Sequence, residues 1–277
     1  MKKFLSVLLS CSMLLVGLAA CSSSTDDEEE TVETVELTAG GSTSVQPLME
    51  LIAEAFEEAG YGTITVEGGG SSVGTQGAID GTFDVGMASR ALKDEELEYL
   101  EETIIALDGI AVIVNTENTA VTDLTIEQLY GIFTGEITNW SEVGGEDAEI
   151  TVVAREEGSG TRDGFESVVG FDSEELVESA EIQNSTGAVV TSVSGNTNAI
   201  GYISLGSLTD EVSAVTVEGV EASEDTILDG TYLLQRPFVL ATLIDSDVAD
   251  TLFDFIFSDE GAAIISENGY VPVDAEE

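Results

Sequence analysis

One arrangement recurs along this chain: an apolar, β-branched segment ends in a short run of glycine and hydroxyl residues, and an amphipathic segment follows at once. In its clearest copy, residues 150–153 have the pattern of a strand, and residues 158–161 read Gly-Ser-Gly-Thr. Phe165, Val168 and Val169 then fall on one face of a helix. Strands and helices that alternate through such turns predict an open α/β sheet, in which ligands bind where the strands end.

Two further copies lie near the start of the chain. Residues 35–39 alternate as a strand and lead through residues 40–44 (Gly-Gly-Ser-Thr-Ser) into a helical pattern. Residues 63–67 form the next predicted strand, which ends in residues 68–72 (Gly-Gly-Gly-Ser-Ser) before another helix. Glycine and serine are common in turns, so a single turn of this kind carries little information. Three turns of the same build predict one shared site.

The chemistry of these turns favours an anion as ligand. The start of a helix presents unpaired backbone N–H groups and the positive end of the helix dipole. Gly158 and Gly160 allow the backbone to approach a ligand, and the hydroxyls of Ser159 and Thr161 add donors. Arg155 supplies a charged, fork-shaped pair of donors. We therefore predict an oxyanion site in which Ser159 is a hydrogen-bond donor rather than a nucleophile.

Positive charge is scarce, because the chain has 7 basic and 55 acidic residues and a formal net charge of −48. Nucleic acid is therefore a poor partner, and we expect none. The chain has no histidine, which excludes Ser-His-Asp and Cys-His catalytic groups and any His-ligated metal. We expect no catalytic residue, no metal and no cofactor. Arg155 and Arg162 lie in one turn despite this scarcity, which favours a binding role; neutralisation of neighbouring acids is the alternative.

The first residues predict export. Lys2 and Lys3 precede a mostly apolar run at 4–20, which is short for a membrane span. The run ends in Leu-Ala-Ala-Cys, which resembles the lipobox of bacterial lipoproteins, so residues 1–20 are predicted to be a signal peptide and Cys21 to be lipidated at the cell membrane. A plain secretory signal is the alternative. Residues 21–36 are predicted to be an acidic, disordered tether.

Two long apolar runs, at residues 104–115 and 232–243, are predicted strands that cross between two lobes. Lobe I would consist of residues 37–111 and 233–277, and lobe II of residues 112–232. The first two turns would then belong to lobe I and the third to lobe II. An anion held by both lobes would close the cleft between them.

Other segments are assigned from their periodicity. Helices are predicted at residues 93–100, 126–133 and 186–193. Trp140 is expected to lie in the core or along the hinge, and Arg236 is expected to be structural.

The chain resembles the phosphate-binding proteins of bacterial high-affinity phosphate ABC transporters. The resemblance spans nearly all of the folded part and is carried by residues 41–48, 70–72, 86–90, 108–115, 129–140, 155–161, 199–205 and 235–238. It implies an α/β, two-lobed periplasmic-binding-protein fold of type II, in which each lobe is a mixed sheet flanked by helices and two crossover strands join the lobes. It also implies extracytoplasmic binding of inorganic phosphate and its delivery to the permease subunits of an ABC transporter.

The same resemblance implies the ligand contacts. Those carried over to matching positions are Thr43, Ser44, Ser71, Arg155, Ser159, Gly160 and Thr161. Ser42 and Ser72 could be either contacts or helix caps. Glu157 matches an acid that orients Arg155.

At Arg90 the chain departs from the family pattern. Many relatives carry an aspartate there, which accepts the proton of phosphate and so excludes sulfate. Arg90 could be a second cationic ligand, with Asp163 or Glu157 as the proton acceptor, or it could pair at the surface with Asp94 or Glu95. Because that aspartate is missing, a binding protein for sulfate, molybdate or another tetrahedral oxyanion is an alternative. A surface phosphatase is the less favoured alternative.

Overall fold

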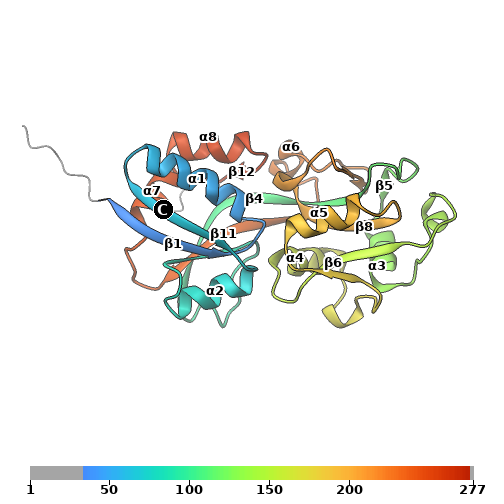
Figure 1. Cartoon of the computed structure of the whole chain (residues 1–277), viewed down its shortest axis with the longest axis horizontal. Helices are drawn as coiled ribbons and strands as arrows, with labels where there is room; N and C mark the ends of the chain where they lie inside the picture. Colours follow the sequence, from blue (N-terminus) through green and yellow to red (C-terminus); the bar gives the residue numbers. More distant parts are fainter. Residues whose placement is uncertain (1–33, 275–277) are drawn as a thin grey trace, which may run out of the picture. The chain divides into compact units, whose positions relative to one another are not determined.

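The computed structural model describes residues 34–274 (Figure 1). The predicted signal peptide, Cys21 and nearly all of the predicted tether lie outside these residues. Within them, no helix combines the length and the apolar character needed to cross a bilayer.

Strands and helices alternate through most of the described chain, as the turn pattern predicts. The helices are α1 (Gln46–Glu58), α2 (Ser71–Ile79), α3 (Ile126–Thr134), α4 (Gly160–Val169), α5 (Thr186–Ser194), α6 (Glu224–Leu228), α7 (Asp250–Ile256) and α8 (Asp259–Glu267). The longer strands are β1 (Val35–Gly41), β2 (Gly62–Gly68), β3 (Val85–Ala88), β4 (Leu100–Asn115), β6 (Thr151–Arg155), β8 (Ala199–Ser204) and β11 (Gln235–Leu243). The shorter strands are β5 (Asp123–Leu124), β7 (Glu181–Gln183), β9 (Val212–Ala214), β10 (Thr216–Val217) and β12 (Val271–Pro272).

One mixed sheet runs through the molecule in the order β2-β1-β3-β11-β4-β8-β6-β7. The strands β1, β2 and β3 are parallel to one another, and so are β6, β7 and β8. Between these two parallel sets, β11 pairs in antiparallel fashion with residues 100–109 of β4 (Figure 1). Because parallel strands end at one edge, the turns after β1, β2 and β3 lie together, as do those after β6 and β7.

The hydrophobic core falls into two sets of clusters, which define the lobes. The clusters of lobe I take buried side chains from residues 37–106 and 238–270. Those of lobe II take them from residues 110–234, with Val271 as an addition. The amphipathic patterns of the sequence decide which faces are buried: in α1, for example, Leu48, Ile52 and Phe56 are inaccessible to solvent.

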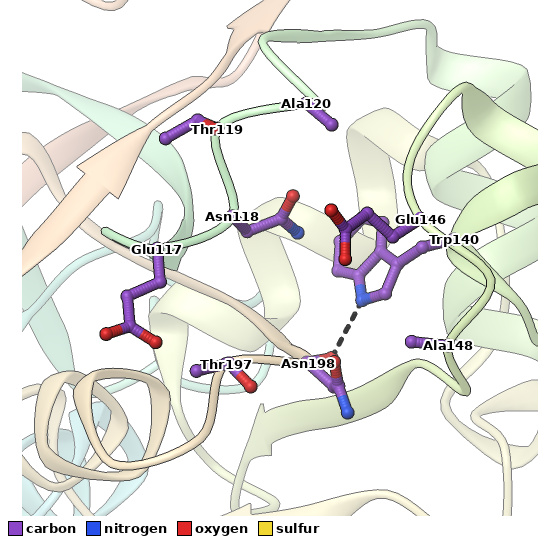
Figure 2. Close-up of a pocket in the computed structure, with 9 residues that line it drawn as sticks. All are labelled: Glu117, Asn118, Thr119, Ala120, Trp140, Glu146, Ala148, Thr197 and Asn198. Carbon is purple, nitrogen blue, oxygen red and sulfur yellow. Dashed lines mark hydrogen bonds between the residues drawn. The ribbon is translucent and has the colours of Figure 1, made fainter.

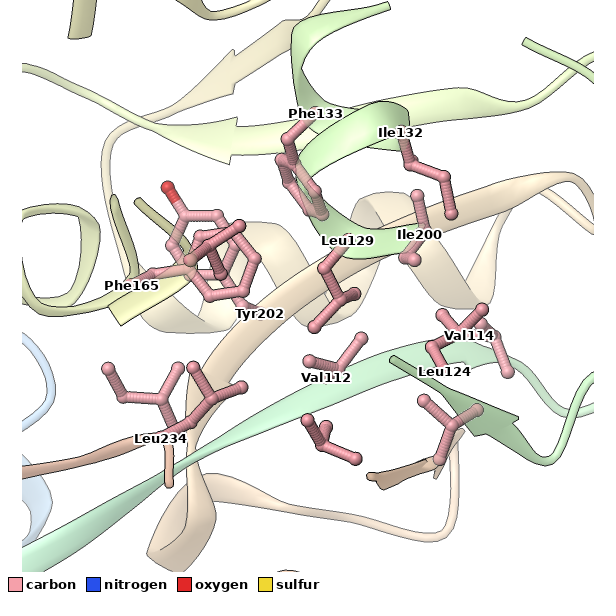
Figure 3. Close-up of a cluster of buried hydrophobic side chains, with 14 of the residues drawn as sticks. Val112, Val114, Leu124, Leu129, Ile132, Phe133, Phe165, Ile200, Tyr202 and Leu234 are labelled. Atoms are coloured by element: carbon pink, nitrogen blue, oxygen red, sulfur yellow. The ribbon is translucent and has the colours of Figure 1, made fainter. Parts of the chain in front are cut away.

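The core of lobe II also fixes the helix that carries the third turn. In α4, Phe165 stacks on Tyr202 of β8 with ring centroids 4.2 Å apart, and it lies 4.6 Å from the ring of Phe133 (Figure 3). The Tyr202 hydroxyl in turn accepts a hydrogen bond from the Arg155 amide at 3.2 Å. Burial raises the pKa of Tyr202, so this hydroxyl is protonated at neutral pH. The third turn therefore starts from a rigid strand end.

The strands that cross between the lobes are joined by a buried ion pair. Arg236 of β11 donates from Nε and Nη2 to Asp108 of β4, at 3.2 and 3.0 Å. Ser204 of lobe II donates to the other oxygen of the same carboxylate at 2.9 Å. The expectation that Arg236 is structural agrees with these contacts.

The structure corrects two local predictions. Residues 35 and 36, given to the tether, belong to β1 and pair with Gly62 and Thr63. The predicted helix at residues 93–100 is absent: residues 94–99 form turns, and Leu100 already begins β4. There, the Glu96 side chain accepts a bond from the Lys93 amide and caps the turn instead of facing solvent. The lobe boundaries at residues 111/112 and 232/233 stay a proposal.

Candidate functional site

The three glycine and hydroxyl turns named from the sequence meet where the two lobes face each other. Side chains of the turn after β1 contact residues of the turn after β6, although more than a hundred positions separate them in the chain. The turn after β2 contacts the same partner turn from its other side. The structure therefore brings Thr43, Ser44, Ser71, Arg155, Gly160 and Thr161 into one cluster.

Hydroxyl groups form the centre of this cluster. The Ser44 hydroxyl lies 2.8 Å from that of Thr161 and 3.0 Å from that of Thr186. Thr43 is half-buried, whereas Ser44, Thr161 and Thr186 are buried. A hydroxyl can donate or accept, so each group can turn its hydrogen toward an anion without leaving a buried polar atom unpaired.

Serines of lobe I form the second side of the cluster. Ser71 accepts hydrogen bonds from the amide of Gly160, at 3.2 Å, and from that of Ser89, at 3.1 Å. The Ser42 hydroxyl donates to Ser89 at 2.9 Å and accepts from the Ser44 amide. Ser42 therefore shapes its own turn, but it is not the N-cap of α1, which is Val45 and has no side-chain cap bond. Ser72 lies where the two lobes meet, and its amide donates to the Gly158 carbonyl of lobe II at 3.1 Å.

Arg155 supplies the charge of the cluster and is 1% exposed. Its Nη2 donates to the Thr43 hydroxyl at 3.1 Å, and its Nη1 donates to that of Thr186 at 3.2 Å. Its Nε and Nη2 also donate to the two oxygens of Glu156, at 2.8 and 2.9 Å. This two-point pairing holds the guanidinium plane in one orientation.

The acid that orients Arg155 is Glu156, so the assignment of that role to Glu157 was wrong. Glu157 is exposed, whereas the carboxylate of Glu156 is bonded to the guanidinium. The two acids are neighbours in the sequence, and only the path of the chain as it leaves β6 decides which one faces the arginine.

The start of α4 is capped from within lobe II. Ser159 accepts from the Arg162 amide at 3.3 Å and is 1% exposed, so its hydroxyl is first of all a helix cap. Arg162 pairs with Glu166 one turn later and donates to the Arg155 carbonyl at 3.2 Å. Arg162 thus stabilises the turn through the Arg155 carbonyl. It also neutralises an acid, as the alternative stated, but that acid is Glu166.

Arg90 does not pair with Asp94 or Glu95, which are both exposed. Its Nη1 and Nη2 donate to Glu96 at 2.7 and 2.8 Å, and its Nε lies 3.0 Å from Asp163 of α4. Burial alone would raise the pKa of Glu96, but the bonds from Arg90, Lys93 and Thr75 and the Arg90 charge lower it to about 2. Burial alone would lower the pKa of Arg90, but the carboxylates of Glu96 and Asp163 raise it. The alternative of a surface pair with Asp94 or Glu95 was therefore wrong.

A family model described as a PBP superfamily domain matches residues 24–260. The phosphate-binding protein PstS of Staphylococcus aureus is 32% identical over 253 residues, a match that covers 83% of this chain and 76% of that protein. The chain belongs to the phosphate-binding protein family. PstS 2 of Streptococcus pneumoniae, from the same family, is 43% identical over 135 residues, and this match spans about half of each protein, 46% of either length.

A solved structure resembles the fold over most of this chain. It is a protein from Clostridium perfringens with bound phosphate, and it is 44% identical to this chain. The superposition has a TM-score of 0.83 and covers 86% of this chain and 99% of that one. The predicted fold class, a two-lobed periplasmic-binding-protein fold, is thereby confirmed.

Two residues of the cluster were not predicted from the sequence. Thr186 begins α5, and Ser89 follows β3, so both stand at strand-to-helix turns or strand ends like the predicted residues. Ser185-Thr186-Gly187 has the same hydroxyl and glycine composition as the other turns. That composition was the available signal, but the preceding strand β7 has only three residues and is too short to stand out.

A separate hollow of about 220 Å³ lies in lobe II, away from the cluster (Figure 2). Its walls include Glu117, Glu146 and Trp140, whose indole donates to the Asn198 carbonyl at 3.0 Å. Trp140 is 2% exposed and packs in the lobe II core, so it is a core residue and does not line the hinge. In residues 34–274, no group of three or more His, Cys, Asp or Glu side chains is arranged to hold a metal ion.

Proposed function

We propose that this protein binds inorganic phosphate between its two lobes and delivers it to the permease subunits of an ABC transporter for import. The observation that carries the proposal is the contact of a buried, oriented Arg155 with hydroxyls from both lobes. The Staphylococcus aureus relative is a phosphate-binding protein and the Clostridium perfringens structure holds bound phosphate, and both findings support this choice of ligand.

The proposed ligand contacts are donors of three kinds. Arg155 gives two charged N–H groups, and the amides of Gly160 and Thr161 point out of the start of α4. Hydroxyl donors are assigned to Thr43, Ser44, Ser71, Ser159, Thr161 and, from the contacts described above, Ser89 and Thr186. Ser42 and Ser72 are proposed as turn-shaping residues rather than ligands.

Closure of the lobes is the proposed signal for transport. The anion would take the place of the hydroxyl partners that now bond to one another, so each lobe would contribute donors to one tetrahedral group. Short charged bonds inside a dehydrated cleft hold such an anion despite the formal net charge of −48, because salt screens distant charges over about 8 Å.

Location and anchoring belong to the same proposal. An extracytoplasmic protein, held at the cell membrane by a lipid on Cys21, would present phosphate to its permease. We also propose that the protein is not an enzyme, because the chain has no histidine to act as a general base.

A second oxyanion, sulfate, is the competing ligand. Glu156 is the carboxylate bonded to a member of the cluster, and both of its oxygens already accept from Arg155. Discrimination of protonated phosphate from fully ionised sulfate would therefore depend on hydroxyl oxygens as proton acceptors.

Calorimetric titration of the mature protein with phosphate and with sulfate, at pH 6 and pH 8, tests the proposal. We expect phosphate to bind more tightly than sulfate at both pH values. Arg155→Ala should raise the phosphate Kd by about tenfold or more, because charged hydrogen bonds contribute about 1.5 to 3 kcal/mol. Lys93→Ala, which removes an exposed cation, is the matched control and should leave Kd unchanged. Failure to bind phosphate, or an unchanged Kd in Arg155→Ala, would refute the assignment.

A further inference from the structure

The two terminal nitrogens of Arg90, Nη1 and Nη2, are held by residues of lobe I. Two of its nitrogens bond to Glu96, and Nη1 also donates to the Ala91 carbonyl at 2.9 Å. Glu96 is itself fixed by Thr75, at 2.6 Å, and by the Lys93 amide, at 2.8 Å. Arg90 is 7% exposed and Glu96 is 8% exposed, so neither side chain can move without breaking buried bonds.

The remaining nitrogen of Arg90 faces lobe II. Nε lies 3.0 Å from Oδ2 of Asp163, in the first turn of α4. Both atoms are shielded from solvent, and among residues 34–274 neither makes a hydrogen bond, so each is paired only by the charge of the other across this ion pair. The Asp163 side chain as a whole is 31% exposed, so the pair sits at the rim of the cleft.

This ion pair stands next to other contacts that join the lobes. Two positions before Asp163, Thr161 contacts Ser44 of lobe I, and one position earlier the Gly160 amide donates to Ser71. Opening of the cleft would break the pair together with these bonds. Since Arg90 stays bound to Glu96, the Arg90–Asp163 pair can form again with little loss of conformational entropy by the arginine side chain.

We propose that Arg90 and Asp163 form a latch across the cleft, which stabilises the closed arrangement of the lobes and slows the release of the bound anion. Arg90 is thus a positioning residue that acts on the lobes rather than a ligand of the anion. This inference rests on the proposed binding of phosphate in the same cleft. An ion pair that forms only when the lobes are closed stabilises the closed, anion-bound state, and it therefore lowers the apparent Kd mainly by slowing dissociation.

The variant Asp163→Asn separates the latch from a purely repulsive role of Asp163, and amide exchange measured without ligand separates it from a role as acceptor of the phosphate proton. If Asp163 acts only as a negative charge close to the anion, its neutralisation relieves repulsion and tightens phosphate binding. If Asp163 is the partner of Arg90, the same change opens the latch and weakens binding. We expect a Kd that is about three- to tenfold higher, through faster dissociation with an unchanged association rate.

Amide hydrogen exchange follows the latch without any ligand. The Ser72 amide donates to the Gly158 carbonyl and the Gly160 amide to Ser71, so both are protected only while the lobes touch. In Asp163→Asn these two amides should exchange faster, while the amides of the β4 and β8 ladder keep their protection. Asp163→Glu, which keeps the charge, should restore most of the protection and of the affinity.

Asp94→Asn is the matched control, because it removes an exposed acid close to Arg90 in the chain without touching the latch. Tighter phosphate binding in Asp163→Asn, or unchanged exchange at Ser72 and Gly160, would overturn the latch. Faster exchange throughout the core would overturn it too, since it would indicate general loss of stability. If the unmodified protein bound no phosphate, the proposed function would fail, and the exchange experiment would still decide whether the latch exists.

Discussion

Replacement of Glu96 by Gln tests whether the anchor of Arg90 has the strength that its contacts imply. The pKa of Glu96 falls from 4.5 to about 2 in the folded protein. One pKa unit corresponds to about 1.4 kcal/mol, so the ionised carboxylate stabilises the fold by about 3 kcal/mol at pH 7. Because the folded-state pKa is depressed, this contribution is present above the unfolded-state value and is lost as pH falls toward 2. At pH 3.5 about 2 kcal/mol of it remains.

Urea unfolding of the unmodified protein and of Glu96→Gln, followed by circular dichroism at pH 7 and at pH 3.5, measures this contribution. We expect Glu96→Gln to be less stable by about 3 kcal/mol at pH 7 and by about 2 kcal/mol at pH 3.5. Glu95→Gln is the matched control, because Glu95 is exposed and contacts no arginine. A stability difference for Glu96→Gln that is the same at both pH values, or one below that of the control, would refute the reasoning.

Two substitutions test the anion cluster itself. In Gly160→Ala the added Cβ would lie 2.5 Å from the Ser71 hydroxyl and 2.8 Å from the Ser89 hydroxyl, so the two lobes could not come together. The phosphate Kd should therefore rise more than about tenfold, with little change in thermal stability. Gly187→Ala adds the same group where nothing lies within 4 Å, and an equal Kd for the two variants in calorimetry would contradict the close approach. Glu156→Gln should raise the phosphate Kd on the order of tenfold, because one of the two bonds that orient Arg155 is lost. Glu157→Gln should bind like the unmodified protein, and a reversed order of these two variants would restore Glu157 as the orienting acid.

The part of the fold that depends on local pattern could be predicted from the sequence. The alternating run before Ser42 and the spacing of Leu48, Ile52 and Phe56 determine β1 and α1 with little help from distant residues. The prediction of a helix at residues 93–100 failed because its polar residues suit a helix in isolation. In the fold, Glu96 is drawn inward by Arg90 and the chain turns into β4.

In the candidate site, too, the features set by local sequence could be predicted, and the contacts between distant segments could not. The composition of each turn marked Thr43, Ser71 and Arg155 as donors, and the structure brings them together. The partners of the arginines could not be predicted in the same way, because each arginine has several acids nearby in the sequence. The choice of Glu156 over its neighbour, or of Asp163 for Arg90, depends on backbone direction and on contacts between distant segments.

The pairing of β4 with β11 has a consequence for how such a molecule can be altered. Gly109 of β4 and Gln235 of β11 are paired neighbours, and both lie close to the proposed boundaries between the lobes. The segment between them is therefore one continuous insertion whose two ends lie side by side. This segment could be exchanged for the corresponding segment of a relative without changing the path of the remaining chain. A hybrid protein made at this junction would take its lobe I hydrogen-bond donors from one parent and its lobe II donors from the other. Each set of donors could then be selected separately.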